Sequence, residues 1–177
     1  MTTAVPVLIV MAGLPGTGKT TLAKVLAVRL QACYLRIDTI EQALMRSTPA
    51  IDQVSDAGYL AAYALAADNL RPGSVVIADS VNPITLTRED WQAVGDRAGA
   101  RTLNLALICS DKAQHRARVE RRVADIPGHQ MPSWQDVENR EYEPWTKDAL
   151  NADHLVLDTT TMTTQACCDA VMAWLEE

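Results

Sequence analysis

Eight consecutive residues near the start of the chain follow the spacing G-x-x-x-x-G-K-T, which suits the binding of phosphate groups. The loop consists of Gly13, Leu14, Pro15, Gly16, Thr17, Gly18, Lys19 and Thr20. Glycine lets backbone amides approach an anion closely, because no Cβ stands in the way. The lysine ammonium can reach the β- and γ-phosphates, and the threonine hydroxyl can coordinate Mg²⁺. The spacing therefore predicts a site for a nucleoside triphosphate.

The sequence on both sides of this loop supports the same prediction. An apolar run at residues 5–11 predicts a buried strand, and residues 19–30 predict a helix. The positive N-terminal end of such a helix attracts phosphate, and the strand-to-helix context makes the motif more specific. No guanine-reading motif is evident, so ATP with Mg²⁺ is the expected ligand.

Strand-like and helix-like segments alternate along the rest of the chain. The expected strands are 5–11, 33–37, 74–78, 102–108 and 154–157, and the expected helices are 19–30, 39–46, 56–69, 87–98, 111–123, 133–141 and 163–175. Such alternation predicts a parallel sheet with helices on both faces, an α/β three-layer sandwich. The length of 177 residues suits a single domain over residues 1–177.

Two aspartates follow expected strands, where ligands bind in open parallel sheets. Asp79 follows the third strand and is expected to bind Mg²⁺, although it could instead be a turn or cap residue. Asp38 follows the second strand and is expected to act as a general base toward a hydroxyl group, with helix capping as the alternative. An acceptor molecule is expected between these aspartates and residues 82–88. Arg88 either contacts an anionic acceptor there or is an exposed arginine at a helix start.

Arginines are concentrated between residues 116 and 122 of this acidic chain. Arg118 and Arg122 are four residues apart and would share one face of a continuous helix. Because the guanidinium fork suits phosphate oxygens, we expect this pair to contact the nucleotide, and Arg116 or Arg121 to form solvated salt bridges. The following segment, about 123–145, is rich in proline and polar residues and predicts a short lid. Within it, Ser133 followed by Asp136 predicts a helix start.

Composition limits the classes of partner. The net charge of −6 argues against nucleic acid or an anionic membrane as partner, and no apolar run is long enough to span a membrane. The four cysteines lack metal-ligand spacing. We therefore expect a cytoplasmic protein without disulfides, a monomer or homodimer whose partners are ATP and a small-molecule hydroxyl acceptor.

Taken together, these residues resemble the small bacterial P-loop kinase-like ATPases, the group of gluconate kinase, chloramphenicol phosphotransferase and zeta toxins. Segments 7–21, 37–41, 77–83 and 118–134 carry the resemblance. It implies a five-stranded parallel sheet of order 2-3-1-4-5 with a short arginine-bearing lid.

The resemblance also implies roles for individual residues. Residues 13–21, from Gly13 to Thr21, would hold the triphosphate, and Mg²⁺ would lie at Thr20 and Asp79. Arg118 and Arg122 would contact the adenine side and the phosphates, and Thr159 would border the adenine. Lys19, Asp38 and Arg122 would be the catalytic residues.

The function that these features favour is ATP-dependent transfer of the γ-phosphoryl group to a hydroxyl of a small molecule. Three alternatives stay open: a nucleotide-dependent switch or ATPase without a small-molecule acceptor, a toxin-like nucleotide-sugar kinase, and a nucleic-acid end kinase. The last of these would bind with a steep salt dependence. The identity of the acceptor does not follow from the sequence.

Overall fold

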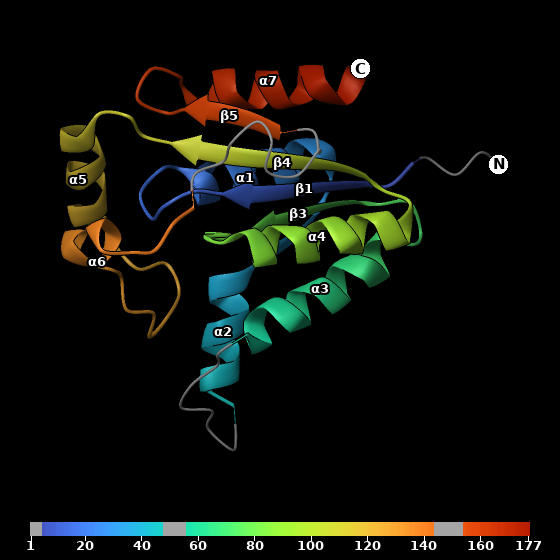
Figure 1. Ribbon diagram of the computed structural model, residues 1–177, viewed down its shortest axis with the longest axis horizontal. Coiled ribbons are helices and arrows are strands. Elements are labelled where there is room, and N and C mark those ends of the chain that lie inside the picture. Colours follow the sequence, from blue (N-terminus) through green and yellow to red (C-terminus); the bar gives the residue numbers. More distant parts are fainter. Residues whose placement is uncertain (1–4, 48–55, 144–153) are drawn as a thin grey trace.

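The computed structural model describes residues 5–47, 56–143 and 154–177, which contain a five-stranded parallel sheet (Figure 1). The strands are β1 (Val7–Ala12), β2 (Cys33–Arg36), β3 (Val75–Asp79), β4 (Arg101–Ile108) and β5 (His154–Asp158). Their order is β2-β3-β1-β4-β5, and every neighbouring pair is parallel. The predicted fold class and strand order are confirmed.

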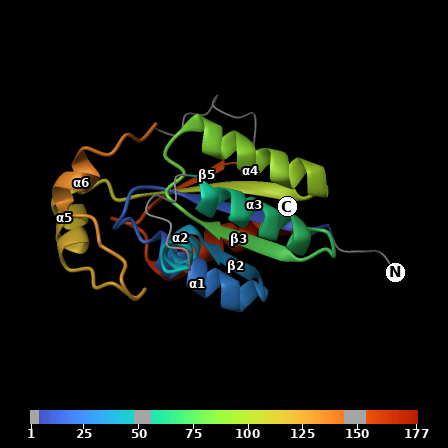
Figure 2. The same cartoon turned by 90° about the horizontal axis from the view of Figure 1, so that it is seen from below.

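Helices cover both faces of the sheet and make three layers (Figures 1 and 2). The helices in the described residues are α1 (Lys19–Leu30), α2 (Ile37–Met45), α3 (Ala57–Leu70), α4 (Thr85–Ala98), α5 (Lys112–Glu120), α6 (Trp134–Glu138) and α7 (Thr164–Glu176), of which α1 and α7 pack on one face of the sheet and α3 and α4 on the other. Successive side chains of β1 point to opposite faces. Ile9 and Met11 pack with α1 and α7, whereas Leu8 and Val10 pack with α3 and α4. The central strand is therefore apolar throughout, as burial on both faces requires.

The carboxyl ends of the strands meet at one edge of the molecule, where α5 and α6 also lie (Figure 1). The loop between β1 and α1 is at this edge, because Met11 and Ala12 end β1 opposite Asp79 of β3 and Ala106 of β4. This is the edge at which open parallel sheets bind ligands.

Several helices differ from their predicted bounds in ways that affect the site. α2 begins at Ile37, so Asp38 lies inside its first turn rather than before it. α5 ends at Glu120, so Arg122 does not share a helix face with Arg118. α6 covers only Trp134–Glu138, although the predicted Ser133–Asp136 capping box is confirmed.

The start of α4 shows why some helix bounds escape prediction. The helix begins at Thr85, two residues before the predicted start, and its N-cap residue Ile84 has no capping side chain. The cap is instead Glu143, whose Oε2 accepts hydrogen bonds from Thr85 N at 2.7 Å and from Thr85 Oγ1 at 2.5 Å. A cap from a distant part of the chain leaves no local sequence pattern.

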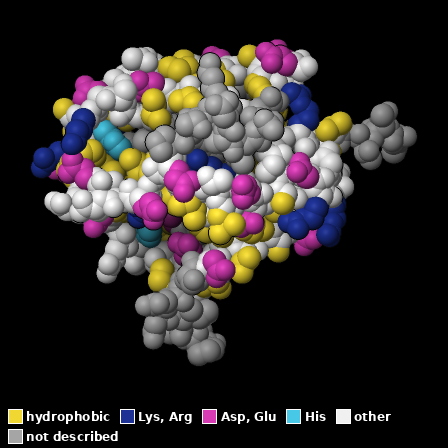
Figure 3. Space-filling view, in the orientation of Figure 1, with side chains coloured by type: hydrophobic (Ala, Val, Ile, Leu, Met, Phe, Trp, Pro, Cys, Tyr) yellow, Lys and Arg dark blue, Asp and Glu magenta, His cyan; other side chains and the backbone are white. Residues whose placement is uncertain are grey.

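No helix in the described ranges is long and apolar enough to cross a membrane. On the face shown in Figure 3, acidic and basic side chains are interspersed, with no single broad basic surface.

Candidate functional site

The phosphate loop has the backbone conformation that its glycines allow. Gly13, Gly16 and Gly18 have φ angles of 136°, 87° and 98°, a region that other residues rarely adopt. Gly13 N donates to Val81 O at 3.1 Å, which ties the start of the loop to the segment after β3. Gly18 precedes α1, which has no side-chain cap. The first amides of α1 are therefore left for an anion.

Replacement of Gly13 by alanine is expected to destabilise the fold by about 3 kcal/mol. A Cβ at this position would lie 2.2 Å from the backbone oxygen of Leu107, and the φ of +136° would add strain. Gly99→Ala is the matched control, because Gly99 also has a positive φ but no atom within 4 Å of the added Cβ. We expect it to lose only about 1 kcal/mol. Urea unfolding of both variants measures the difference, and equal losses would contradict the steric argument.

Lys19 is buried beside the loop, with only 8% of its surface exposed. Its Nζ donates to Leu14 O at 2.9 Å. Burial lowers the pKa of Lys19 to about 8, an effect that Asp79 opposes and the positive charge of Arg122 reinforces. A phosphate anion next to this buried ammonium would stabilise its charged form, because a nearby opposite charge raises the pKa of a lysine.

This lowered pKa predicts that ATP binding weakens with rising pH. Only the ammonium form attracts phosphate, so the Kd for ATP should rise up to about tenfold per pH unit above pH 8, until the pKa of Lys19 in the complex is reached.

The same lowered pKa predicts that the free protein becomes more stable as the pH rises. Because the unfolded chain binds more protons between about pH 8 and pH 10.5, the free energy of unfolding should rise there.

ATP titrations at about pH 7 to pH 10 would measure this dependence. A Lys19→Ala variant supplies the control, because its much weaker binding should no longer follow a titration near pH 8. A parent Kd that stays constant across this range would show that the Lys19 charge does not contribute.

One cavity of about 1020 Å³ brings most of the predicted site residues together. Those lining it are Pro15, Gly16, Gly18, Lys19, Thr20, Thr21, Asp38, Asp79, Arg118, Arg122 and Thr159. The remaining predicted residues, Gly13, Leu14 and Thr17, belong to the loop but are not among the residues that line the cavity. Thr17 is 2% exposed, and its Oγ1 donates to Leu14 O at 2.9 Å.

Thr20 and Asp79 present oxygen atoms to this cavity. Asp79 ends β3, is 3% exposed and accepts a hydrogen bond from Tyr34 Oη at 2.7 Å. No group of three or more His, Cys, Asp or Glu residues able to hold a metal occurs in the described part of the chain. A hydroxyl and a carboxylate fit Mg²⁺, which takes few protein ligands and completes its shell with water and substrate phosphate oxygens.

Asp38 lies in the cavity beside Arg36 and His129. Arg36 Nη2 lies 3.6 Å from its Oδ2, and His129 Nε2 lies 4.0 Å from the same oxygen. Arg36 is itself fixed by two contacts with Asp125, at 2.9 and 2.8 Å. The Asp38 side chain is 38% exposed, so it remains accessible to a ligand.

The two predicted arginines reach the cavity from different positions. Arg118 donates to Thr159 Oγ1 at 2.7 Å and to Thr159 O at 2.8 Å, which joins α5 to the loop after β5. Arg122, beyond the end of α5, is partly buried, and this burial lowers its pKa while the nearby Asp38 raises it. Arg116, by contrast, pairs with Glu120 at 2.7 Å on the exposed face, as predicted for one of the outer arginines.

The segment predicted to be a lid, called the lid segment below, is attached to the rest of the fold at both ends of its described part, residues 123–143. At one end, Asp125 pairs with Lys24 at 2.8 Å and with Arg36, and these bonds lower the pKa of Asp125 to about 2. At the other end, Glu143 caps α4. Residues 144 and 145 of the predicted lid lie outside the described residues.

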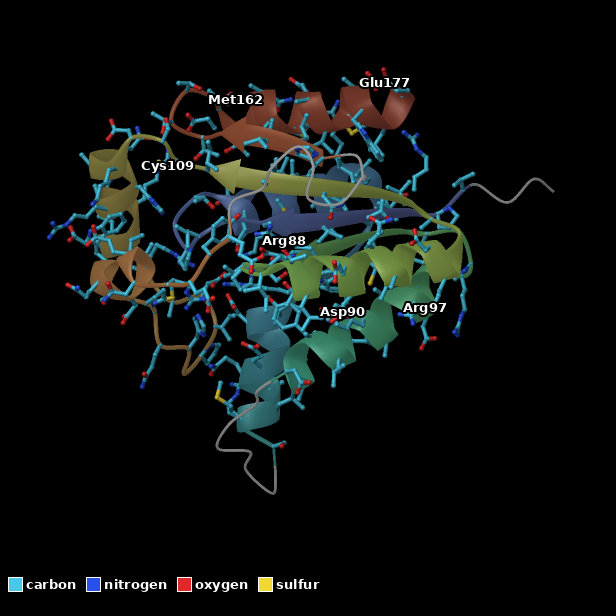
Figure 4. The ribbon with its side chains drawn as sticks, in the orientation of Figure 1. Arg88, Asp90, Arg97, Cys109, Met162 and Glu177 are labelled. Atoms are coloured by element: carbon cyan, nitrogen blue, oxygen red, sulfur yellow. The ribbon has the colours of Figure 1, made fainter. Side chains whose placement is uncertain are left out.

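The predicted role of Arg88 is not supported. It lies in α4 (labelled in Figure 4), is 1% exposed and is absent from the residues that line the cavity. Its guanidinium donates to the backbone oxygens of Asn82, Pro83 and Glu143. Arg88 therefore holds the segment after β3 and the end of the lid together, and burial explains why neither predicted alternative applies.

Glu41, His129 and Arg140 also line the cavity but were not among the predicted site residues. Glu41 follows Asp38 by one helical turn, a spacing that could have indicated it. Burial raises the pKa of Glu41, with Asp38 adding to the shift and Arg140 opposing it. Arg140 carries no sequence signal, because its place depends on how the lid segment folds back.

A parallel sheet of this order and a phosphate loop facing a charged cavity define a P-loop protein with a kinase-like fold. The chain belongs to an AAA domain family, whose sequence model matches residues 8–140. No curated protein sequence matches the chain.

Solved structures share the fold over nearly their whole length. A candidate kinase from Chloroflexus aurantiacus is similar with a TM-score of 0.76 and 24% identity, covering 98% of this chain and 97% of that one. Chaetomium thermophilum Kti12 in complex with ADP-AlF3 has a TM-score of 0.64 and 24% identity, with coverages of 94% and 97%. A gluconokinase from Sinorhizobium meliloti has a TM-score of 0.60 and 16% identity, with coverages of 98% and 93%.

Proposed function

We propose that this protein is an ATP-dependent phosphotransferase, which moves the γ-phosphoryl group of ATP to a hydroxyl of a small molecule. The observation that carries the proposal is the shared cavity, in which the phosphate loop and Lys19 face the same space as Asp38. A pure ATP-binding switch needs the loop but has no need of an accessible carboxylate beside it. The kinases among the structural neighbours have the same fold, which supports the assignment.

The proposed reaction assigns each step to a group on the cavity wall. Asp38 accepts the proton of the acceptor hydroxyl, whose oxygen forms a bond to the γ-phosphorus as the bond to the β–γ bridging oxygen breaks. Lys19 and Arg122 stabilise the charge that spreads over the transferred group. Mg²⁺, held by Thr20 and Asp79, would offset negative charge on the β- and γ-phosphates. ADP and the phosphorylated acceptor are the products.

The acceptor would occupy the end of the cavity formed by α2 and the lid segment. Asp38 and Glu41 supply carboxylate oxygens there, and Arg140 supplies hydrogen-bond donors. Glu41 packs closely against α3, because a Cβ added to Gly58 would come within 2.4 Å of Glu41 Cγ. We propose that Glu41 binds the acceptor rather than taking part in proton transfer.

The proposal is tested by ADP release from Mg·ATP across a panel of acceptors: sugars, sugar acids, nucleosides, aminoglycoside- and phenicol-like alcohols, and 5′-hydroxyl oligonucleotides. Lys19→Ala serves as the blank, and mass spectrometry identifies the phosphorylated product. Stimulation by one class of small alcohol is the expected result. Tight ATP binding without transfer to any acceptor would contradict the proposal and favour the switch.

Arg122→Ala is expected to lower kcat by about 100-fold, because a partly buried guanidinium near the transferred group stabilises charge that develops in the transition state. Arg116→Ala is the matched control, since Arg116 is exposed and paired with Glu120. Steady-state kinetics on the acceptor found above would compare the two variants. A kcat within twofold of the parent for Arg122→Ala would place Arg122 outside the reaction.

A further inference from the structure

His115 has no role in the proposed reaction, yet it is one of the few buried polar side chains next to the site. It lies in α5 and is 6% exposed. Its Nε2 is 2.8 Å from Pro15 O in the phosphate loop. Because a carbonyl oxygen can only accept, Nε2 carries the hydrogen and donates it to this oxygen.

This hydrogen bond constrains the next amide of the loop. The Pro15 carbonyl and the Gly16 N–H belong to one planar peptide unit, in which a trans bond points them in opposite directions. When His115 holds the carbonyl toward α5, the Gly16 N–H is turned the other way. Gly16 lines the cavity, and loop amides of this kind bind phosphate oxygens.

The surroundings of Gly16 show that α5 packs closely against the phosphate loop. A Cβ added to Gly16 would lie 2.6 Å from Val119 Cγ2 and 3.3 Å from His115 Cδ2. The loop cannot shift toward α5, so the hydrogen bond to His115 and this contact together set its position.

The other side of the imidazole contacts the lid segment. The rings of His115 and Trp134 pack edge to face, with centroids 5.2 Å apart and an interplanar angle of 83°. Trp134 begins α6, directly after Pro132 and Ser133, and Pro132 lines the same cavity as the phosphate loop. One buried side chain therefore contacts both the phosphate loop and the lid segment.

We propose that His115 is a positioning residue for the nucleotide phosphates: it orients the Gly16 amide toward them and is itself held in place by Trp134 of the lid segment. The inference concerns nucleotide binding alone and needs no phosphoryl acceptor. It can therefore fail while the proposed phosphotransferase activity holds, and the reverse is also true.

ADP affinity, measured by calorimetry, tests the hydrogen bond. His115→Phe keeps an aromatic ring against Trp134 but removes the donor, and should weaken ADP binding by about tenfold. His115→Gln keeps a donor and should restore affinity to within about threefold of the parent. Arg116→Leu, on the exposed face of the same helix, is the control and should bind like the parent. Thermal unfolding of each variant shows whether the fold is kept.

Two results would overturn the assignment: parent-like ADP affinity in His115→Phe, or an affinity in His115→Gln as low as in His115→Phe. The second would show that packing rather than the donated hydrogen bond matters.

A double-mutant cycle tests the link to the lid segment, and its Trp134→Leu single variant remains informative if His115→Phe does not fold. Trp134→Leu alone should weaken ADP binding several-fold in the parent background, because His115 loses its packing partner. In the His115→Phe background the same change should have little further effect, since its effect passes through the hydrogen bond. Unchanged affinity in Trp134→Leu, or simple additivity of the two effects, would contradict the role of Trp134.

Discussion

Lys19→Ala is expected to lower kcat by about 100- to 1000-fold and ATP affinity by about tenfold or more. Lys19 is buried at the phosphate loop, where the low dielectric strengthens its attraction to the β- and γ-phosphates. With alanine at this position, the γ-phosphoryl group lacks the positive charge of the lysine ammonium. Calorimetry with ATP would measure the affinity, and ADP release with the identified acceptor would measure the turnover.

Lys24→Ala is the matched control for this result. Lys24 lies in the same helix, but its side chain is 53% exposed and pairs with Asp125 rather than facing the cavity. Its removal takes away one exposed ion pair, which contributes little stability. If Lys19→Ala bound ATP as tightly as Lys24→Ala, the assignment of residues 13–20 as a phosphate site would be wrong.

The second large effect is expected for Asp38→Asn, which should lower kcat by about 100- to 10,000-fold while leaving the Kd for ATP within twofold. The amide keeps the shape of the carboxylate but cannot take the hydroxyl proton. Arg36 and His129 border the same oxygen, so the side chain should keep its place. Single-turnover phosphoryl transfer with the identified acceptor separates this step from product release.

Two further variants test whether the loss of kcat is specific to Asp38. Asp169→Asn should leave kcat unchanged, because Asp169 is exposed, pairs with Arg29 and does not line the cavity. Glu41→Gln should raise the KM for the acceptor with little change in kcat, because Glu41 is proposed to bind the acceptor rather than to accept a proton. Full kcat in Asp38→Asn would remove Asp38 from the role of base and leave Glu41 as the carboxylate to test next.

The phosphate loop was predictable because all of its determinants are local. A strand, a turn with glycines at fixed positions and a helix occupy consecutive residues, and the chemistry follows from their types. The strand order came from the resemblance to a known family rather than from hydrophobic periodicity, which does not specify how parallel strands are arranged. Asp38 and Asp79 were predictable from their places after strands, since the carboxyl ends of parallel strands share one edge.

The lid segment was only partly predictable. Its composition indicated a cover with a helix starting at Ser133, and that helix is present. Its attachment depends on the contact between Arg36 and Asp125 and on the hydrogen bond from Thr85 N to Glu143. The residues of these pairs are 89 and 58 positions apart in the sequence. The prediction for Arg88 was wrong for the same reason. Its guanidinium donates to the backbone oxygen of Glu143, a contact between distant parts of the chain.

The sequence by itself therefore determined the phosphate loop and the alternation of strands and helices, because these depend on residue types within short stretches of chain. The tertiary structure decided which side chains share the cavity with that site. Arg122 lies beyond a helix that ends early, Glu41 is placed by its packing against Gly58, and His115 connects the phosphate loop to Trp134. Each of these depends on contacts between distant segments, whose free energies are set only when the segments pack together.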